Sequence, residues 1–132
     1  RVQFGKPIGA FQALQHRAAD LVIGLEFARS LMEWAAETIK ENDPDAPVAV
    51  SMAKSYCGDT GKKVVAEGIQ MHGGIGFTWD HDMHLYFKRV WTSDNAFGDG
   101  NYHREAIAQA LDNIHQLAGN GRWTKDPGKI IN

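Results

Sequence analysis

The hydrophobic residues of this chain recur at helical spacing over two long, consecutive runs, and this pattern limits the folds that the chain can adopt. The first run covers residues 11–39 and predicts one long helix, because its apolar positions form a broad stripe. The second run covers residues 48–69 and predicts another long helix, which ends at Gly73. Pro44 and Pro47 lie between the runs, where they predict a turn.

Two shorter runs with the same spacing predict helices over about residues 82–95 and 102–117. Short connections between long amphipathic helices favour antiparallel neighbours. The sequence therefore predicts an all-α fold, an antiparallel four-helix bundle formed by residues 1–118. Residues 119–132 follow the last periodic run, and we expect them to form a surface tail.

Composition agrees with one globular domain and excludes several classes of function. The chain has 132 residues, of which 43% are apolar, so it can bury a core without metals or disulfides. Its 14 basic and 16 acidic residues give a net charge of −2, which argues against nucleic acid as a partner. A single cysteine, Cys57, cannot form an internal disulfide and fits a reducing compartment.

The sequence also argues against a membrane location. No apolar run approaches the roughly 20 residues of a membrane span, and the polar start of the chain does not read as a signal peptide. We therefore expect no membrane span and a cytoplasmic location.

Glycines are unusually placed in the second predicted helix. Gly58, Gly61 and Gly68 lie inside it, and each lowers helix propensity by roughly 1 kcal/mol relative to alanine. Such positions indicate close approach by a neighbouring helix. Gly73 and Gly74 follow at the helix exit, where the missing side chains allow another molecule or chain to come very close.

Two short motifs occur in a fixed order along the chain. The first opens it and reads Arg1-Val2-Gln3-Phe4-Gly5, followed by Phe11-Gln12 at the start of the first long helix. The second ends the second long helix and reads Gln70-Met71-His72-Gly73-Gly74-Ile75-Gly76. Together the motifs resemble the C-terminal helical domain of acyl-CoA dehydrogenases, and the resemblance covers nearly the whole chain up to Gly119.

The resemblance implies a flavoprotein of lipid metabolism, such as fatty acid β-oxidation. It implies an FAD-dependent oxidoreductase that desaturates an acyl-CoA thioester at the α,β position and passes electrons to an electron-transfer acceptor. In the family this domain helps to form the FAD site and a tetramer. The residues that the resemblance assigns to cofactor binding are Arg1, Gln3, Phe4, Gln12, Gln70, Gly73 and Gly74.

The resemblance also suggests what these residues do. Arg1, Gln3 and Phe4 would lie along the pyrophosphate and adenosine of a neighbouring subunit's FAD, and an arginine suits a diphosphate because its planar fork donates two hydrogen bonds. Gln12 would contribute from the following helix, and Gln70 would contact the adenine end. From the residues alone, Arg1 could equally be an exposed terminal cation, and Gln70 a solvated side chain of the last helical turn.

The catalytic base of the family has no counterpart at its usual place. Many members use a glutamate followed by Gly-Thr, and this position falls on Phe97, followed by Gly98 and Asp99. Phenylalanine cannot abstract a proton. The base could lie upstream of residue 1, it could be a local carboxylate such as Asp99 or Asp94, or this subunit could have none. Asp99 is also a good N-cap for the fourth helix.

A second hypothesis treats the chain as a non-catalytic assembly subunit of a heteromeric acyl-CoA dehydrogenase-like complex. Both hypotheses predict an oligomer, a homo- or heterotetramer, and we expect the isolated chain to be inactive. Several aromatic residues could anchor an interface or fill the core: Trp34, Phe77, Trp79, Tyr86, Phe87 and Trp91. His81 and His84 stand three residues apart, but without a third ligand they do not predict a metal site.

Overall fold

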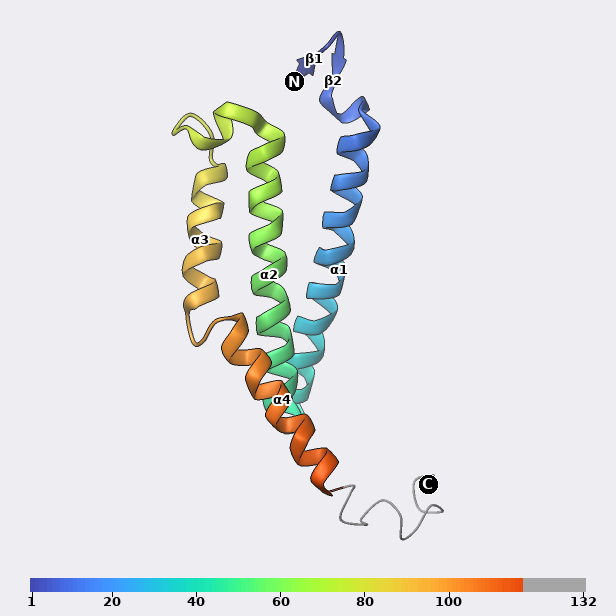
Figure 1. Ribbon diagram of the computed structural model, residues 1–132, viewed down its shortest axis with the longest axis vertical. Coiled ribbons are helices and arrows are strands. Elements are labelled where there is room, and N and C mark those ends of the chain that lie inside the picture. The colour runs from blue at the N-terminus through green and yellow to red at the C-terminus, as the bar shows by residue number, and fades with distance from the viewer. Residues whose placement is uncertain (118–132) are drawn as a thin grey trace.

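The structure, a computed structural model, describes the backbone of residues 1–117 and the side chains of residues 1–113. The described α-helices are α1 (Gln12–Lys40), α2 (Ala46–His72), α3 (Met83–Asn95) and α4 (Gly100–Leu117) (Figure 1). Shorter elements are β1 (Val2–Gln3), β2 (Lys6–Pro7) and the 3₁₀ turns η1 (Ile8–Ala10) and η2 (Gly73–Phe77). The predicted all-α fold and its four helices are confirmed. The predicted tail, residues 119–132, lies outside the described residues.

The turn between α1 and α2 lies where Pro44 and Pro47 predicted it. Asn42 has a left-handed φ of 54°, and the N–H of Asp45 donates to the Oδ1 atom of Asp43 at 2.8 Å. Pro47 lies in the first turn of α2, where its missing N–H has no helical partner to lose. The chain therefore reverses within residues 41–45, and α2 runs antiparallel to α1.

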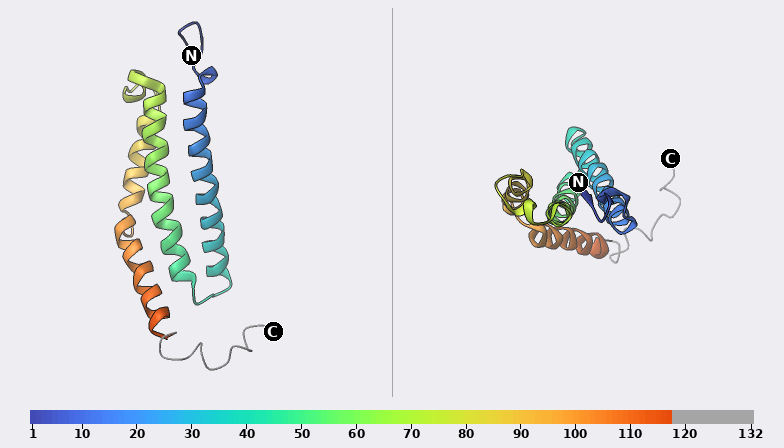
Figure 2. Two further views of the ribbon diagram at one scale, coloured as in Figure 1. Left: turned by 45° about the vertical axis from the view of Figure 1, so that its right-hand side comes forward. Right: turned by 90° about the horizontal axis from the view of Figure 1, so that it is seen from above.

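Helix α2 is the centre of the fold and makes the main contacts with α1, α3 and α4. Helix α3 runs antiparallel to α2 along one half of it, and α4 then continues in the same direction along the other half (Figures 1 and 2). Both α3 and α4 therefore run antiparallel to α2, as α1 does. The loop between α3 and α4 bends the chain without reversing it.

The glycines of α2 lie against α3, as the sequence predicts. A methyl group on Gly58 would overlap the carboxylate of Asp94, and one on Gly61 would come within 3.2 Å of a Val90 methyl group. A methyl group on Gly68 would overlap the end of the Met83 side chain. Close packing of α3 therefore leaves little room for a side chain at these positions.

The buried core consists mainly of small side chains. Its hydrophobic members are Ala28, Ala35, Ala49, Ala53, Val65 and Ile69. Large side chains of the predicted stripe on α1 remain exposed, including Phe27 at 59% and Met32 at 57%. Most of the predicted aromatic anchors are exposed as well, including Trp79 at 80%. The described residues thus leave much apolar surface uncovered. None of the described helices is apolar over a length that could cross a bilayer.

Candidate functional site

A β-hairpin positions the first motif. Strand β1 pairs with the antiparallel strand β2, a hairpin that the sequence analysis did not predict. Phe4 and Gly5 form its turn with φ angles of 55° and 78°, the left-handed pair that a tight hairpin turn requires. The N–H of Ile8 donates to the carbonyl of Arg1 at 3.1 Å, which fixes the backbone of Arg1 at the base of the hairpin.

The second motif meets the first at the end of α2. Gly73 terminates α2 with a φ of 71°. A Cβ atom on Gly73 would come within 3.2 Å of the Arg1 guanidinium, so Arg1 lies directly over this glycine. The last carbonyl groups of a helix carry partial negative charge and favour a nearby cation. The two motifs therefore form one site, and the glycine gives the arginine room.

A cavity of about 390 Å³, here called the hairpin pocket, opens beside this contact. Its lining residues are Arg1, Gln3, Phe4, Ile8, Phe11, Ala13, Leu14, Arg17, Gln70 and Met71. Four predicted cofactor residues thus face one cavity, and Gly73 contacts one of them. Gln12 and Gly74 do not line it: Gln12 is the exposed first residue of α1, and Gly74 is also exposed.

One charged lining residue of the hairpin pocket, Arg17, was missed by the sequence analysis. Arg17 lies on α1, three residues after Leu14 and on the same helix face, and it forms an ion pair with Glu67 of α2. Its three-residue spacing from Leu14 could have predicted that both side chains lie on one face of α1. The pairing with Glu67 could not be predicted from the sequence, because it depends on the register of α1 against α2.

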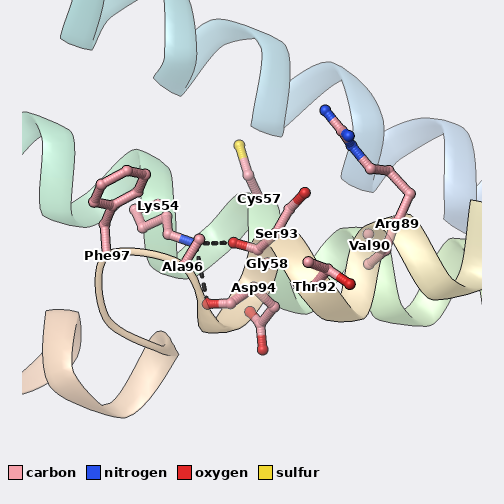
Figure 3. A pocket seen from close by; sticks show the side chains of 11 residues that line it. Lys54, Cys57, Gly58, Arg89, Val90, Thr92, Ser93, Asp94, Ala96 and Phe97 are labelled. Atoms are coloured by element: carbon pink, nitrogen blue, oxygen red, sulfur yellow. Dashed lines mark hydrogen bonds between the residues drawn. The ribbon is translucent and has the colours of Figure 1, made fainter.

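A second cavity, here called the Phe97 pocket, lies between α2 and α3 and has a volume of about 630 Å³ (Figure 3). Its lining residues are Lys54, Cys57, Gly58, Gly61, Arg89, Val90, Thr92, Ser93, Asp94, Ala96 and Phe97. Phe97 follows α3 with a left-handed φ of 62°, and its side chain is 95% exposed. The residue that the resemblance aligns with the family base is therefore an aromatic ring presented at a pocket.

Polar contacts from α2 and α4 hold the loop that carries Phe97. The Lys54 ammonium donates to the carbonyls of Ser93 at 2.6 Å and Asp94 at 3.0 Å, at the end of α3. His103 is buried, and its Nε2–H donates to the carbonyl of Phe97 at 3.1 Å. Its Nδ1 atom lies 3.2 Å from the hydroxyl oxygen of Ser51 on α2, within hydrogen-bond distance. The left-handed conformation is thus fixed from α2 and α4.

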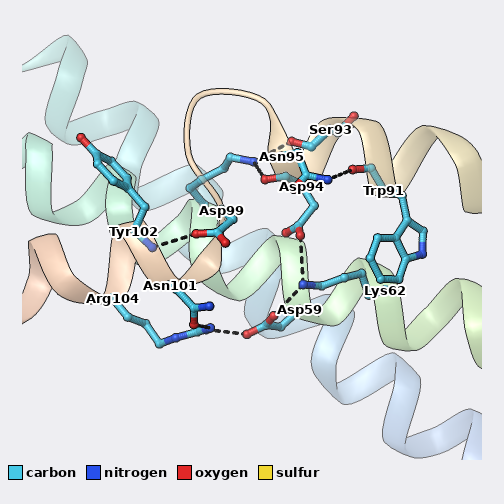
Figure 4. A network of polar contacts seen from close by, with 11 residues as sticks. Asp59, Lys62, Trp91, Ser93, Asp94, Asn95, Asp99, Asn101, Tyr102 and Arg104 are labelled. Atoms are coloured by element: carbon cyan, nitrogen blue, oxygen red, sulfur yellow. Dashed lines mark hydrogen bonds and ion pairs between the residues drawn. The ribbon is translucent and has the colours of Figure 1, made fainter.

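The two local carboxylates considered as a base both have structural partners (Figure 4). Asp99 accepts the N–H of Tyr102 at 2.9 Å, as the N-cap interpretation predicts. Asp94 is buried and accepts from the Lys62 ammonium at 3.0 Å. Each carboxylate therefore stabilises a helix end or a contact between helices.

The Lys62 contact continues into a network between α2 and α4 (Figure 4). Asp59 pairs with Lys62 at 3.2 Å and with Arg104 at 2.7 Å. Burial alone would raise the pKa of Asp59, but hydrogen bonds from Arg104 and Lys62 bring it below its ordinary value. Hydrogen bonds to Asp94 and Asp59 raise the pKa of Lys62. Asp59 and Lys62 are therefore both charged at neutral pH.

Cys57 lines the Phe97 pocket as a neutral thiol. Burial raises its pKa, and the nearby Lys54 opposes this shift only in part. Its S–H donates to the carbonyl of Ala28 at 3.6 Å. A thiol with a raised pKa carries little thiolate at neutral pH and is a poor nucleophile.

The two histidines after η2 face different neighbours. The His81 ring packs on His72 with centroids 4.2 Å apart, and the His84 ring packs on Trp79 at 4.4 Å. Among the side chains that the structure describes, no group of three potential metal ligands comes together.

Comparison with known proteins places the sequence in one family. The family model for the acyl-CoA dehydrogenase C-terminal domain matches residues 1–112. The acyl-CoA dehydrogenase IpdE2 of Mycobacterium tuberculosis is 47% identical over 90 residues, which make up 68% of this chain and 26% of the relative. The chain thus spans less than a third of the length of the curated relatives that it matches.

Solved structures show the same fold. The ChsE4–ChsE5 complex from Mycobacterium tuberculosis gives a TM-score of 0.79 at 33% identity, covering 85% of this chain and 30% of that one. A variant of the Tcur3481–Tcur3483 steroid ACAD gives a TM-score of 0.82 at 29% identity, covering 88% of this chain and 32% of that one.

Proposed function

Because the chain belongs to the acyl-CoA dehydrogenase family, as its C-terminal helical domain, we propose that it completes an FAD site in an enzyme that desaturates acyl-CoA thioesters at the α,β position. The observation that carries this proposal is the hairpin pocket, where Arg1, Gln3 and Gln70 meet from two distant motifs. The reaction belongs to a larger protein, and we expect the chain alone to be inactive. A cytoplasmic location and a role in lipid breakdown are parts of this proposal that rest on the family.

The donor groups of the hairpin pocket fit a phosphate-bearing dinucleotide. The Arg1 guanidinium can donate two parallel hydrogen bonds to phosphate oxygens. The amides of Gln3 and Gln70 can both donate and accept, as the polar edge of an adenine or a ribose requires. Phe4, which is 92% exposed, offers an apolar ring to a base. When bound, FAD would accept the β-hydride of the substrate. Arg1, Gln3, Phe4 and Gln70 would hold and orient the FAD.

The absence of a carboxylate at Phe97 limits the part that this chain plays in proton transfer. Asp94 is held by Lys62, and Asp99 caps α4, so both carboxylates have other partners. We therefore propose that the proton of the substrate is removed by a group outside the described residues. That group would lie upstream of residue 1 or on a partner subunit.

A second candidate function is a non-catalytic assembly subunit in a heterotetramer. The observation that favours it is the exposed apolar surface of α1 and α3, together with Phe97 at the usual place of the base. Two of the similar solved structures are named as pairs of different chains. Both functions hold at once if this chain completes the FAD site of a partner subunit.

The proposal is tested by the flavin content of the full-length protein. We expect Arg1→Met and Gln70→Ala to lower the ratio of bound FAD to protein, measured by visible absorbance after purification. Arg29→Met and Gln109→Ala are matched controls, since both side chains are exposed and lie outside the hairpin pocket. Flavin content unchanged in both pocket variants would contradict the proposed roles.

An anaerobic titration with acyl-CoA thioesters separates the two candidate functions. Bleaching of the flavin absorbance would support a complete dehydrogenase. Bound flavin that stays oxidised with every thioester, but bleaches after a partner subunit is added, would support the assembly subunit.

A further inference from the structure

We infer that Arg17, which is paired with Glu67 of α2, is a second anion-binding side chain of the hairpin pocket. This inference rests on the proposed function, because it assigns a further contact to the phosphate-bearing ligand of the same pocket. Arg17 stands outside both sequence motifs. It reaches the pocket from the second turn of α1, whereas Arg1 reaches it from the hairpin.

The ion pair with Glu67 leaves part of the Arg17 guanidinium free for a ligand. Glu67 contacts the Nη2 atom of Arg17, and a guanidinium has five N–H donors in a fixed plane. The Arg17 side chain is 44% exposed although it is paired. The contact involves one nitrogen of the guanidinium, so the remaining donors can bind an anion.

The charges around the pocket favour an anion with more than one negative charge. The lining includes Arg1 and Arg17, and no lining residue carries a carboxylate. Glu67 lies behind Arg17 on α2, so it offsets part of the positive charge. A diphosphate would meet guanidinium groups from two directions. Arg1 alone would leave one side of such a group without a cation.

A purely structural role for the pair makes a different prediction from ligand binding. If Arg17 and Glu67 only clamp α1 to α2, loss of either partner has the same effect on stability and none on ligand affinity. If Arg17 binds the anion, the two losses act in opposite directions. Removing Arg17 leaves the Glu67 carboxylate uncompensated beside the pocket, whereas removing the charge of Glu67 raises the positive potential there.

The experiment measures binding of ADP, which carries the diphosphate and adenosine of FAD, to the full-length protein after removal of flavin. By isothermal titration calorimetry, we expect Arg17→Met to weaken binding by about tenfold or more, as for the loss of one charge-assisted hydrogen bond. We expect Glu67→Gln to raise the affinity, because it removes a negative charge beside the pocket. Arg29→Met is the matched control, because Arg29 lies on the same helix in an ion pair with Glu26 and should not change affinity.

The outcomes separate this inference from the proposed function. Equal loss of melting temperature in Arg17→Met and Glu67→Gln with unchanged ADP affinity would overturn the inference. If Arg17→Met does not fold, Glu67→Gln decides, since tighter ADP binding in that variant supports the inference and equal or weaker binding contradicts it. If Arg1→Met also leaves ADP binding unchanged, the proposed cofactor site itself is wrong. Loss of binding in Arg1→Met but not in Arg17→Met contradicts only the role of Arg17.

Discussion

Among residues 1–117, three residues other than glycine adopt left-handed backbone conformations: Phe4, Asn42 and Phe97 have φ angles of 55°, 54° and 62°. Asparagine tolerates this region because its short side chain bonds locally, whereas a bulky residue there costs roughly 1–2 kcal/mol. For Phe97, the hydrogen bond from His103 to its carbonyl helps to offset that cost. Its ring is nevertheless almost fully exposed.

The backbone of Phe97 gives a direct prediction for stability. We expect Phe97→Gly to stabilise the chain by about 0.5–1 kcal/mol, because glycine removes the left-handed strain and only part of the gain is lost to a more flexible unfolded state. Urea unfolding followed by circular dichroism measures the change. Gly98→Ala is the opposite control, since Gly98 has a φ of 98° and alanine should destabilise there. A clear loss of stability in Phe97→Gly would mean that the ring makes a stabilising contact.

At the scale of the elements, the contact between α2 and α3 decides which glycines of α2 can change. A Cβ atom on Gly58 displaces the buried Asp94 carboxylate from Lys62, whereas one on Gly68 displaces only the flexible end of Met83. Both changes gain about 1 kcal/mol of helix propensity. An alanine should therefore destabilise the protein at Gly58 but not at Gly68.

We expect Gly58→Ala to destabilise the full-length protein by about 1–3 kcal/mol, the cost of a disturbed buried charge and its hydrogen bonds. Gly68→Ala should be neutral or slightly stabilising. Thermal unfolding of both variants under one condition provides the comparison. Equal melting temperatures would show that Asp94 moves aside without loss.

The helices were predictable because the residues that form, start and end them act locally. Apolar periodicity, Pro47 and Gly73 each act within a few residues of the helix that they shape. The hairpin was missed because its strands have two residues each, too short for a periodic pattern. The resemblance supplied Arg1 and Gln70 as site residues, but the sequence offered no basis for the contact of Arg17 with Glu67. That contact joins positions far apart in the chain.

At the scale of the whole molecule, exposed apolar surface is the dominant feature. On α1, Ile23, Phe27 and Trp34 recur along one flank and are 56%, 59% and 40% exposed. Contiguous apolar patches of this kind mark interfaces in soluble proteins. The described chain therefore has the surface of a component that is covered by other chains or domains.

This surface predicts that the chain, produced by itself, self-associates. Light scattering coupled to size exclusion should give a mass above the 14.6 kDa of one chain, because burial of the apolar flanks drives association. Replacing Phe27 and Trp34 by polar residues should shift the mass toward the single chain. A monodisperse monomer without these changes would contradict the prediction.

Helix α2 also keeps the two pockets apart. Lys54 of the Phe97 pocket and Gln70 of the hairpin pocket lie on the same helix, separated by about 24 Å at 1.5 Å per residue. A substitution that impairs one pocket need not change the structure of the other. In genetic terms, two alleles with lesions at opposite ends of α2 would be expected to complement each other when both chains enter one oligomer, whereas two lesions at the same end would not.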